Sequence, residues 1–333
     1  MNRSGKMMEI DWPSLHGGHF SGTKVLVTGG AGFIGSHLSE ALVRLGARVL
    51  VIDDLSGGTR DNLKNFGPVE FVHGSILDGT LLNRCAAGSR YVFHLAALGS
   101  VPRSVEQPRL YNDVNTIGTL NVLEAAREAK AQRVIFSASS SAYGENPVPW
   151  VETMPPLPKS PYAATKLAGE GLLRAWATSY HLDTASLRYF NIFGPRQNAN
   201  SAYAAVIAAF AKALIAEQRP IIYGDGKQSR DFTFVANAVH ANLLAARRSE
   251  PVRGEVINVG CGGAVSVNEL AKSMAAALGR PEVRPIYEPE RTGDIKHSFA
   301  DLAKANKVLG YRPVVAFEAG LKQTIEWYRQ VLA

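Results

Sequence analysis

The stretch at residues 24–54, KVLVTGGAGFIGSHLSEALVRLGARVLVIDD, decides the fold of this chain. Its first β-branched run, residues 25–27, predicts a short buried strand that ends in a cluster of glycines. Apolar residues then recur at helical spacing over 37–45, and residues 48–52 predict a second strand. A strand, a glycine turn, a helix and a second strand within roughly thirty residues indicate two parallel strands joined by a helix.

The same alternation continues along the chain. Further strands are predicted at 70–72, 91–95, 134–137, 183–187 and 256–259, and long helices at 115–129 and 162–180. Strands that alternate with helices predict an α/β fold with a doubly wound parallel sheet, the Rossmann arrangement. After about residue 190 the helices become shorter and prolines and arginines accumulate, which predicts a smaller C-terminal substrate-binding lobe.

Composition excludes several classes of protein. The 333 residues are 46% hydrophobic and 20% charged, which is typical of a globular protein with a large core. No apolar run is long enough to span a membrane, and the most apolar predicted helix, 203–217, is interrupted by Lys212. The net charge is +7, but the basic residues are scattered and no nucleic-acid-binding motif accompanies them. We therefore expect neither a membrane nor a nucleic-acid partner.

The cysteines and the N-terminus indicate a cellular compartment. Cys85 and Cys261 lie far apart in the sequence and fit neither a disulfide framework nor a metal site. No apolar segment of a signal peptide follows the charged residues Arg3 and Lys6. We expect a cytoplasmic protein without a metal ion, and we interpret residues 1–22 as a polar, glycine-rich extension of unknown role.

Gly29, Gly32 and Gly35 form a G-x-x-G-x-x-G turn between the first strand and the first helix. Glycines allow the backbone to turn tightly and to approach a pyrophosphate, which the N–H groups at the start of the helix can bind. Asp53 ends the next strand, 24 residues after Gly29, where a carboxylate can accept hydrogen bonds from ribose hydroxyls. Its charge would repel a 2′-phosphate, so the pattern favours NAD over NADP. The alternative is an ordinary strand–helix turn.

Tyr162 and Lys166, in SPYAATK, are four residues apart and share one face of a predicted helix. A tyrosine with a pKa of about 10 is a poor base at neutral pH, but a neighbouring ammonium and an oxidised nicotinamide favour its phenolate. Tyr162 then becomes a general base for a sugar hydroxyl. Ser139, in FSASSSAYG, ends a strand 23 residues earlier and can bridge the base and the substrate. Each element alone is weak evidence, because surface helices and polar caps show the same residues by chance.

Several motifs together resemble a known family. The glycine turn, the Ser139–Tyr162–Lys166 set, LRYFNIFGPRQ at 187–197 and GDGKQSRDF at 224–232 are similar to the extended short-chain dehydrogenase/reductases, and among them to the nucleotide-sugar 4-epimerases. The resemblance covers nearly the whole chain after residue 22. It implies an isomerase with a tightly bound NAD that is regenerated in each turnover. It also implies a homodimer that pairs the helices predicted at 115–129 and 162–180.

The resemblance implies a reaction at carbon 4 of a UDP-sugar, which is oxidised to a 4-keto sugar, rotates and is reduced again on its other face. Similar dehydratases carry Asp-Glu directly after the catalytic hydroxyl residue, and similar decarboxylases carry Glu two residues after it. Ser140 and Ser141 occupy those positions here. Because no carboxylate is available there as a general acid for elimination, epimerisation is favoured. A nucleotide-sugar dehydratase or decarboxylase and a non-catalytic dinucleotide sensor stay open as alternatives.

The resemblance also implies the residues that contact each ligand. Those implied for the cofactor are Gly29, Gly32, Phe33, Ile34, Gly35, Asp53, Asp54, Ser75, Ile76, Ala96, Ala97, Asn115, Tyr162, Lys166 and Tyr189. Those implied for the substrate are Gly99, Ser100, Arg103, Ser139, Ser140, Ser141, Asn191, Ala205, Val206, Tyr223, Arg230, Arg291, Asp294 and Ser298. Ser75 stands where the family usually has an aspartate for adenine, and it can hydrogen-bond without a charge. Arg230 and Arg291 are expected to hold the pyrophosphate, and Asp294 a ribose hydroxyl.

The resemblance implies that Gly99 and Ser100 leave space for the sugar, and the stretch 98–104 is similar to that of the subgroup that acts on N-acetylhexosamines. Ser298 implies room for a 2-acetamido group, because similar epimerases restricted to plain hexoses carry a bulky aromatic at this position. This favours interconversion of UDP-N-acetylglucosamine and UDP-N-acetylgalactosamine. A spacious pocket discriminates weakly, so UDP-glucose and UDP-galactose are expected as further substrates. An enzyme restricted to UDP-glucose, UDP-pentoses or UDP-uronic acids stays open. From the substrate class we expect a role in supplying polysaccharide precursors.

The predicted organisation has three parts. Residues 1–22 form the N-terminal extension. Residues 23–190, with a return segment at about 232–260, form an NAD-binding Rossmann domain. Residues 191–231 and 261–333 form a UDP-sugar-binding lobe.

Overall fold

The structure is a computed structural model that describes residues 9–64, 66–199, 205–290 and 295–332. A seven-stranded sheet forms the centre of the larger lobe, in the order β11-β6-β5-β4-β1-β2-β3. Its strands are β1 (Lys24–Thr28), β2 (Arg48–Asp53), β3 (Glu70–His73), β4 (Tyr91–His94), β5 (Arg133–Ser139), β6 (Asp183–Tyr189) and β11 (Glu255–Val259). Every neighbouring pair is parallel, which confirms the predicted α/β fold with a doubly wound sheet.

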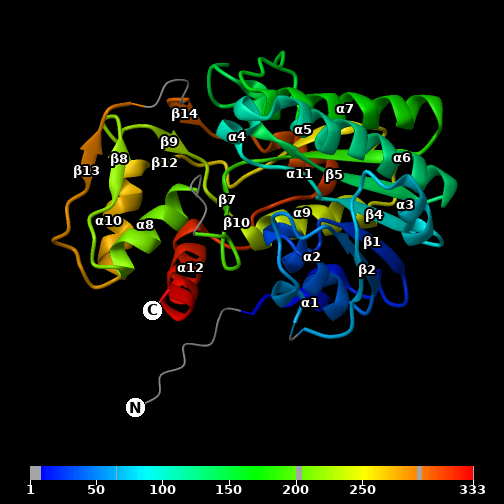
Figure 1. Ribbon diagram of the computed structural model, residues 1–333, viewed down its shortest axis with the longest axis horizontal. Coiled ribbons are helices and arrows are strands. Elements are labelled where there is room, and N and C mark those ends of the chain that lie inside the picture. The colour runs from blue at the N-terminus through cyan, green and yellow to red at the C-terminus, as the bar shows by residue number, and fades with distance from the viewer. Residues whose placement is uncertain (1–8, 65, 200–204, 291–294, 333) are drawn as a thin grey trace.

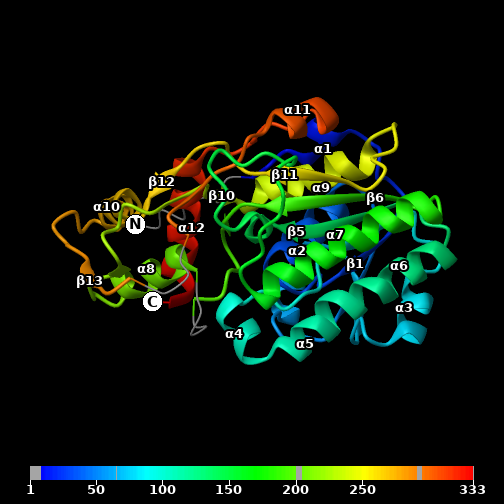
Figure 2. The same ribbon diagram turned by 90° about the horizontal axis from the view of Figure 1, so that it is seen from above.

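Helices cover both faces of this sheet (Figures 1 and 2). One face carries α3 (Gly79–Ala86), α6 (Gly118–Glu128) and α7 (Pro161–Ser179), and the other carries α2 (Phe33–Arg44) and α9 (Val235–Arg247). Strands covered on both faces are apolar along most of their length, as the buried runs at 25–27 of β1, 49–52 of β2 and 91–93 of β4 show. Both predicted long helices are confirmed, although the first starts with a π-helical turn, Asp113–Ile117, which follows α4 (Val101–Glu106) and α5 (Pro108–Asn112).

The strand order places the site. β1 lies between β2, its neighbour in sequence, and β4, so the order of the strands reverses at β1. In open α/β sheets, ligands bind in the crevice at the carboxyl ends of the strands on either side of such a reversal. The glycine turn after β1 and the loop after β4 both lie at this point.

The smaller lobe packs beside this edge of the sheet (Figure 1). It contains α8 (Val206–Ile215), α10 (Val267–Ala277) and α12 (Phe317–Leu332), the pair β8 (Ile221–Tyr223) and β13 (Ile286–Glu288), and the sheet of β12 (Val265–Ser266), β9 (Ser229–Arg230) and β14 (His297–Ser298). β7 (Ile192–Phe193) and β10 (Thr233–Phe234) pair at the junction of the lobes. Residues after 261 are divided between the lobes, because α11 (Ala303–Leu309) packs against β11 and α9. The domain boundaries stay a prediction.

The segment before β1 differs from the polar extension that the sequence suggests. It contains a short helix, α1 (Trp12–His16), and the side chains of Trp12, His16 and Phe20 are buried. His16 Nε2 lies 3.0 Å from His240 Nδ1 on α9, and His19 Nε2 lies 2.9 Å from the Tyr91 hydroxyl. Trp12, His16 and Phe20 recur every four residues, and this helical spacing is the signal that could have shown that the segment packs on the core.

The buried histidine pair predicts a loss of stability in acid. Burial lowers the pKa of His16 to about 3 and that of His240 to about 4. The unfolded chain binds protons at both rings below about pH 6.5 while the folded chain does not, so their contribution to stability falls as the pH drops from about 6.5 toward about 4. Between about pH 7 and about pH 5, each ring is expected to lower the free energy of unfolding by about 2 kcal/mol.

This expectation is checked by urea unfolding of His16→Phe. The difference in unfolding free energy between about pH 7 and about pH 5 should shrink by about 2 kcal/mol relative to the original chain. His181→Asn, at an exposed histidine, serves as the control and should leave that difference unchanged. An unchanged difference in His16→Phe would contradict the assignment of the acid sensitivity to this pair.

Candidate active site

The glycine turn brings three backbone segments together. Gly29 has a φ of +69°, and a Cβ at this position would lie 2.6 Å from the Ala96 amide nitrogen. A Cβ on Gly35 would lie only 2.2 Å from the Gly29 carbonyl oxygen. Gly32 is the N-cap of α2 and no side chain caps that helix start. The first N–H groups of α2 therefore face the turn without a side-chain partner, which is the arrangement that binds phosphate oxygens.

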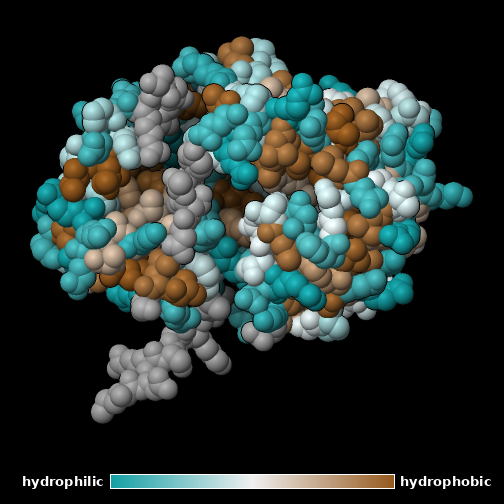
Figure 3. All heavy atoms as spheres, in the orientation of Figure 1, coloured by the Kyte–Doolittle hydropathy of each residue, from teal (hydrophilic) through white to brown (hydrophobic). Residues whose placement is uncertain are grey.

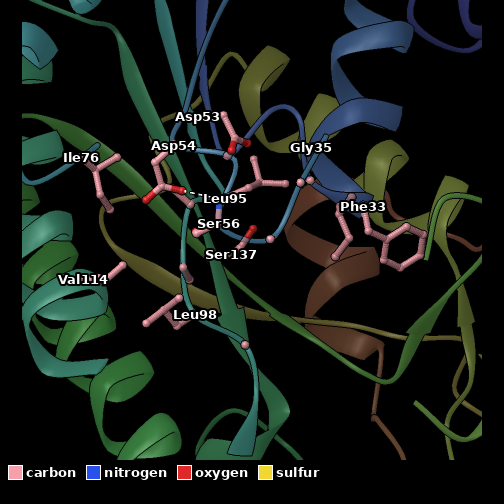
Figure 4. Close-up of a pocket in the computed structure, with 18 of the residues that line it drawn as sticks. Phe33, Gly35, Asp53, Asp54, Ser56, Ile76, Leu95, Leu98, Val114 and Ser137 are labelled. Atoms are coloured by element: carbon pink, nitrogen blue, oxygen red, sulfur yellow. Dashed lines mark hydrogen bonds between the residues drawn. The ribbon is translucent and has the colours of Figure 1, made fainter. Parts of the chain in front are cut away.

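Asp53 ends β2 beside this turn, and its side chain is buried. Its Oδ2 accepts a hydrogen bond from the Ala31 N–H at 2.9 Å, and its Oδ1 accepts from the Leu55 N–H at 2.8 Å. Burial raises the pKa of this carboxyl, and the two backbone donors oppose that rise. A carboxylate has about four acceptor positions, so capacity is left for ribose hydroxyls. Figure 4 shows Asp53 and Asp54 at the same rim of the cavity.

A cavity of about 320 Å³ runs from this turn to α7. Of the residues predicted for the cofactor, it is lined by Gly29, Gly32, Phe33, Ile34, Gly35, Asp53, Asp54, Ile76, Ala96, Ala97, Tyr162, Lys166 and Tyr189, and also by Gly99 from the substrate set. In Figure 4, Ile76, Val114 and Leu98 lie on one side of the cavity and Phe33 lies on the other. Ser75 is not among the lining residues; its hydroxyl accepts from the Leu77 N–H at 3.2 Å.

Sequence reasoning missed part of this lining. The additional residues are Ile52, Ser56, Gly57, Gly58, Gly74, Leu95, Leu98, Val114, Ser137 and Ala138. A Cβ on Gly58 would lie 2.6 Å from the Ala31 carbonyl, so the loop after β2 closes directly on the glycine turn. The Gly57-Gly58 pair after the second strand is the signal that could have shown this.

The three predicted catalytic residues meet at the other end of the cavity. Tyr162 and Lys166 lie in the first turns of α7, which Ser160 caps by accepting from the Ala163 N–H. Ser139 ends β5, and its hydroxyl is close enough to the Tyr162 phenol to oppose the rise of the Tyr162 pKa. Ser139 Oγ lies 2.8 Å from Ser141 Oγ. The end of β5 therefore places two hydroxyl groups beside α7.

The electrostatics of this trio differ from the simplest sequence interpretation. Burial raises the pKa of Tyr162, and the neighbouring Ser139 hydroxyl opposes the rise. Burial lowers the pKa of Lys166 to about 7, opposed by Glu170. Lys166 Nζ donates to the Ser137 carbonyl at 2.8 Å. The protein's own charges therefore leave Tyr162 protonated, and a cationic ligand in the cavity is needed to favour the phenolate.

Two buried polar groups support the trio. Asn115 accepts from the Leu98 N–H at 2.8 Å, and its amide donates to the Leu98 carbonyl and to Thr165 Oγ1, each at 3.1 Å. Asn115 does not line the cavity itself, but it holds the loop at Leu98, which does. Glu170, one turn after Lys166, forms two hydrogen bonds with the Arg188 guanidinium, at 2.8 and 2.7 Å, with both side chains buried. Sequence reasoning missed this pair, although Glu170 follows Lys166 by four residues and so shares its face of the predicted helix.

A second cavity, of about 300 Å³, lies in the smaller lobe. Asn191, Ala205, Val206, Tyr223 and Arg230 from the predicted substrate set line it, together with apolar residues that include Phe193, Phe210, Ile222 and Phe232. Apolar walls with a few polar groups and one guanidinium suit a planar base that carries a phosphate. Figure 3 shows that the surface is hollowed between the two lobes.

Ser298 lies beside residues of the second cavity, although it lines neither cavity itself. It pairs with Arg230 in the β14–β9 ladder, its side chain is 5% exposed, and the Asn191 amide donates to its hydroxyl at 3.4 Å. Asp231, next to Arg230, is fully buried and accepts from the N–H groups of Cys261, Gly262 and Ala300. This carboxylate fixes the strands that carry Arg230 and Ser298.

The remaining predicted substrate residues are less closely grouped. Ser100 caps α4 through the Arg103 N–H, and Arg103 is exposed on that helix. Ser140 and Ser141 continue from β5 in a short 3₁₀ turn. Arg291 and Asp294 lie outside the described residues. Among the described residues, no group of three His, Cys, Asp or Glu side chains is arranged to hold a metal ion. None of the described helices is long and apolar enough to cross a membrane.

An open glycine turn, a carboxylate at the next strand end and a Ser–Tyr–Lys set on a Rossmann sheet define a dinucleotide-dependent enzyme of the short-chain dehydrogenase/reductase type. A sequence model of the NAD dependent epimerase/dehydratase family matches residues 25–260. The chain belongs to this family, and its cofactor is NAD.

Individual relatives agree. The chain is 40% identical over 312 residues to a UDP-glucose 4-epimerase of Mycolicibacterium smegmatis, a match that covers 92% of this chain and 98% of the relative. It is 41% identical, with a TM-score of 0.89, to the solved structure of a UDP-N-acetylglucosamine 4-epimerase from Methanobrevibacter ruminantium in complex with UDP-N-acetylmuramic acid, covering 93% and 99% of the two chains. A Thermus thermophilus UDP-glucose 4-epimerase solved in complex with NAD is 36% identical, with a TM-score of 0.82 and coverage of 92% and 99%.

The residues present fit NAD. The close backbone packing at Gly29 and Gly35 keeps the turn tight, and the start of α2, which no side chain caps, offers its N–H groups to a pyrophosphate. Asp53 keeps acceptor capacity for the adenosine ribose, and Ile76 and Val114 provide an apolar wall for the adenine. Tyr162 and Lys166 lie at the far end, where the nicotinamide riboside would lie.

Proposed function

We propose that this chain is a UDP-sugar 4-epimerase that interconverts UDP-N-acetylglucosamine and UDP-N-acetylgalactosamine, and that it also accepts UDP-glucose and UDP-galactose. The observation that carries the choice of sugar is Ser298, a small buried residue that lies beside Asn191 and Arg230, two residues that line the second cavity. A sugar whose nucleotide occupies that cavity would meet a hydroxyl at this position instead of an aromatic ring. An acetamido group therefore fits.

The choice of epimerisation over dehydration rests on the end of β5. The family contains both reactions, and elimination needs an acid that protonates the leaving hydroxyl. Ser140 and Ser141 follow Ser139 in the 3₁₀ turn, and the Ser141 N–H donates a hydrogen bond to Ser139 Oγ at 3.2 Å. Neither position offers a carboxyl group, which supports simple oxidation and reduction at carbon 4.

When bound, NAD supplies the chemistry of accepting a hydride from carbon 4 and returning it. Tyr162 Oη takes the proton of the 4-hydroxyl and returns it after the sugar has turned. Ser139, whose hydroxyl neighbours the Tyr162 phenol, orients that proton. Lys166, held by the Ser137 carbonyl, places its ammonium beneath the same region of the cavity. The transfer of each proton and hydride is reversed within one turnover, so the product is an isomer of the substrate.

The rotation of the 4-keto sugar needs an anchor outside the reacting centre. The cavity in the smaller lobe provides one, with Phe193 and Phe210 as apolar walls for the base and Arg230 for the phosphates. Because the anchor and the catalytic trio lie in different lobes, the nucleotide can stay fixed while the sugar presents either face to Tyr162.

Ser298→Tyr tests the choice of sugar. A phenol ring in place of the hydroxymethyl group should fill the space for the acetamido group and lower kcat/KM for UDP-N-acetylglucosamine by about 100-fold. The kcat/KM for UDP-glucose should change less than about threefold, because a plain hydroxyl needs no such space. Rates are measured for both substrates on the same enzyme preparations.

Ser298→Ala is the matched control, since it removes the hydroxyl and keeps the volume free. Both substrates should be turned over by this variant at rates close to those of the original chain. Equal losses for the two sugars in Ser298→Tyr, with normal folding, would mean that position 298 does not select the substituent at carbon 2.

A homodimer is the oligomeric state that we propose. Val101, Val105, Leu110 and Ile117 are large apolar residues that are exposed on α4, α5 and the π-helical turn. Apolar atoms gather over these elements in Figure 3, and such a patch marks an interaction surface. Light scattering of the purified protein should give twice the chain mass of 35.8 kDa. A single-chain mass at micromolar concentration would contradict the dimer.

A further inference from the structure

His94 is a buried titratable side chain that the proposed reaction does not use. It ends β4, is 1% exposed, and lies opposite Thr28 of β1 and Phe136 of β5 in the sheet. Its ring Nδ1 lies 2.8 Å from Thr28 Oγ1, and its Nε2 lies 2.9 Å from Thr119 Oγ1 on α6. The ring thus joins the strand residue directly before the glycine turn to the helix that follows the π-helical turn.

The partners of the ring fix its tautomer. The Thr119 hydroxyl donates its single proton to the Asn115 carbonyl oxygen at 2.6 Å. It can therefore only accept from His94, so Nε2 carries the ring proton. Nδ1 is then an acceptor, and the Thr28 hydroxyl donates to it while accepting from the Ala96 N–H at 3.3 Å.

The surroundings keep the ring neutral. The side chains packed around it are Thr28 of β1, Phe136 of β5, Thr119 of α6 and Lys166 of α7. Burial, and then the charge of Lys166, lower the pKa of His94 to about 3. A neutral ring with one donor and one acceptor is a fixed connector at neutral pH, not a proton shuttle.

The connection continues to the catalytic helix. Asn115 forms hydrogen bonds with both backbone groups of Leu98 and with Thr165 Oγ1, and the Thr165 hydroxyl donates to the Tyr162 carbonyl at 2.8 Å. At the other end, Thr28 accepts from the backbone of Ala96, which also packs against Gly29. A buried hydrogen-bonded path therefore runs from β1, past the loop 95–98, to α7.

We propose that His94, as the neutral Nε2–H tautomer, is a positioning residue that fixes the loop 95–98 and α7 relative to the glycine turn. This loop lines the cavity assigned to NAD, and Tyr162 and Lys166 lie on α7. Without the ring, the Thr28 hydroxyl and the π-helical turn lose their common partner, and the two walls of the cavity move independently. The inference rests on the NAD-dependent chemistry of the proposed function and not on the identity of the sugar.

Thr28→Val and Thr119→Val test this role, because each replaces a hydroxyl by a methyl group of similar volume. In each holoenzyme the rate of NAD release should rise about tenfold, from the loss of one buried hydrogen bond. The kcat for whichever UDP-sugar is turned over should fall by about 100-fold, from misplacement of the reacting groups. Thr119→Ser should restore both quantities, and the double variant should be no worse than the more severe single one, because both threonines act through His94.

Thr324→Val is the matched control. Thr324 is a fully buried residue of α12 in the smaller lobe, and its hydroxyl donates to the Gly320 carbonyl at 2.7 Å. This variant should lower the melting temperature and leave NAD release and kcat unchanged. The proposal is overturned if Thr28→Val and Thr119→Val behave like Thr324→Val, or if their effects on NAD release simply add.

A spectroscopic measurement examines the ring directly. In ¹⁵N-labelled holoenzyme, the ring nitrogens of His94 should show the neutral Nε2–H form between about pH 5 and pH 8. A Nδ1–H or doubly protonated ring in this range would contradict the proposal. NAD release and the ring signals are both measured without a sugar, so failure of the proposed substrate leaves this test intact.

Discussion

Replacing Tyr162 by phenylalanine should lower kcat by about 10³-fold while the enzyme keeps its NAD. The phenol is the group placed to take the 4-hydroxyl proton, since it lies in the cavity wall beside the Ser139 hydroxyl. Phenylalanine keeps the ring that fills this wall and removes only the proton acceptor. Turnover of UDP-sugar and the amount of bound NAD per chain are measured on the same preparation.

Tyr311→Phe is the matched control for this substitution. Tyr311 is buried, its hydroxyl donates to the Gly260 carbonyl at 2.9 Å, and it lines neither of the two cavities. Removing this hydroxyl should cost about 1 kcal/mol of stability and leave kcat unchanged. If Tyr162→Phe retained more than about a tenth of the original kcat, Tyr162 would not be the general base.

Gly35→Ala is expected to weaken NAD binding by at least about tenfold and to destabilise the protein by about 2 kcal/mol. The added Cβ would lie 2.2 Å from the Gly29 carbonyl and 2.8 Å from Gly30 Cα, and both of these are backbone atoms that no rotamer change can move. The glycine turn must therefore shift away from α2. Denaturant unfolding and the NAD content of the purified protein measure the two effects.

Gly171→Ala, on α7, provides the comparison. It lies within a helix, as Gly35 does, but its Cβ would meet nothing within 4 Å. Alanine in this place should stabilise the protein by about 0.5–1 kcal/mol and leave NAD binding unchanged. Normal NAD content in Gly35→Ala would show that the close packing of the turn is not what holds the cofactor.

Local patterns in the sequence were sufficient for the sheet and for the centre of the site. The apolar runs marked the strands of the large sheet, and the glycine turn with Asp53 marked the cofactor cavity that the structure shows. Tyr162, Lys166 and Ser139 converge as predicted, because a strand end and a helix start are enough to bring them together. These features depend on residues close together in the sequence or on strand order.

Features that depend on distant partners were not visible. The π-helical turn at 113–117 is tied to Leu98 through Asn115, and the orientation of that side chain follows from a loop 17 residues away. In the sequence, His94 looks like any polar residue at the end of a strand. Its role follows only from the two threonines that the sheet and α6 bring to it. Lys166 was expected to act on the Tyr162 phenol directly, but its ammonium is held by the Ser137 carbonyl.

The central claim is that this enzyme epimerises an N-acetylated UDP-sugar with NAD that it already holds. Proton NMR of the purified protein with UDP-N-acetylglucosamine, and no added NAD, tests it most directly. The account predicts that the anomeric signals of UDP-N-acetylgalactosamine grow until the two sugars reach equilibrium, with no change in total nucleotide-sugar mass. An unchanged spectrum after NAD is also added, in a preparation that epimerises UDP-glucose, would contradict it.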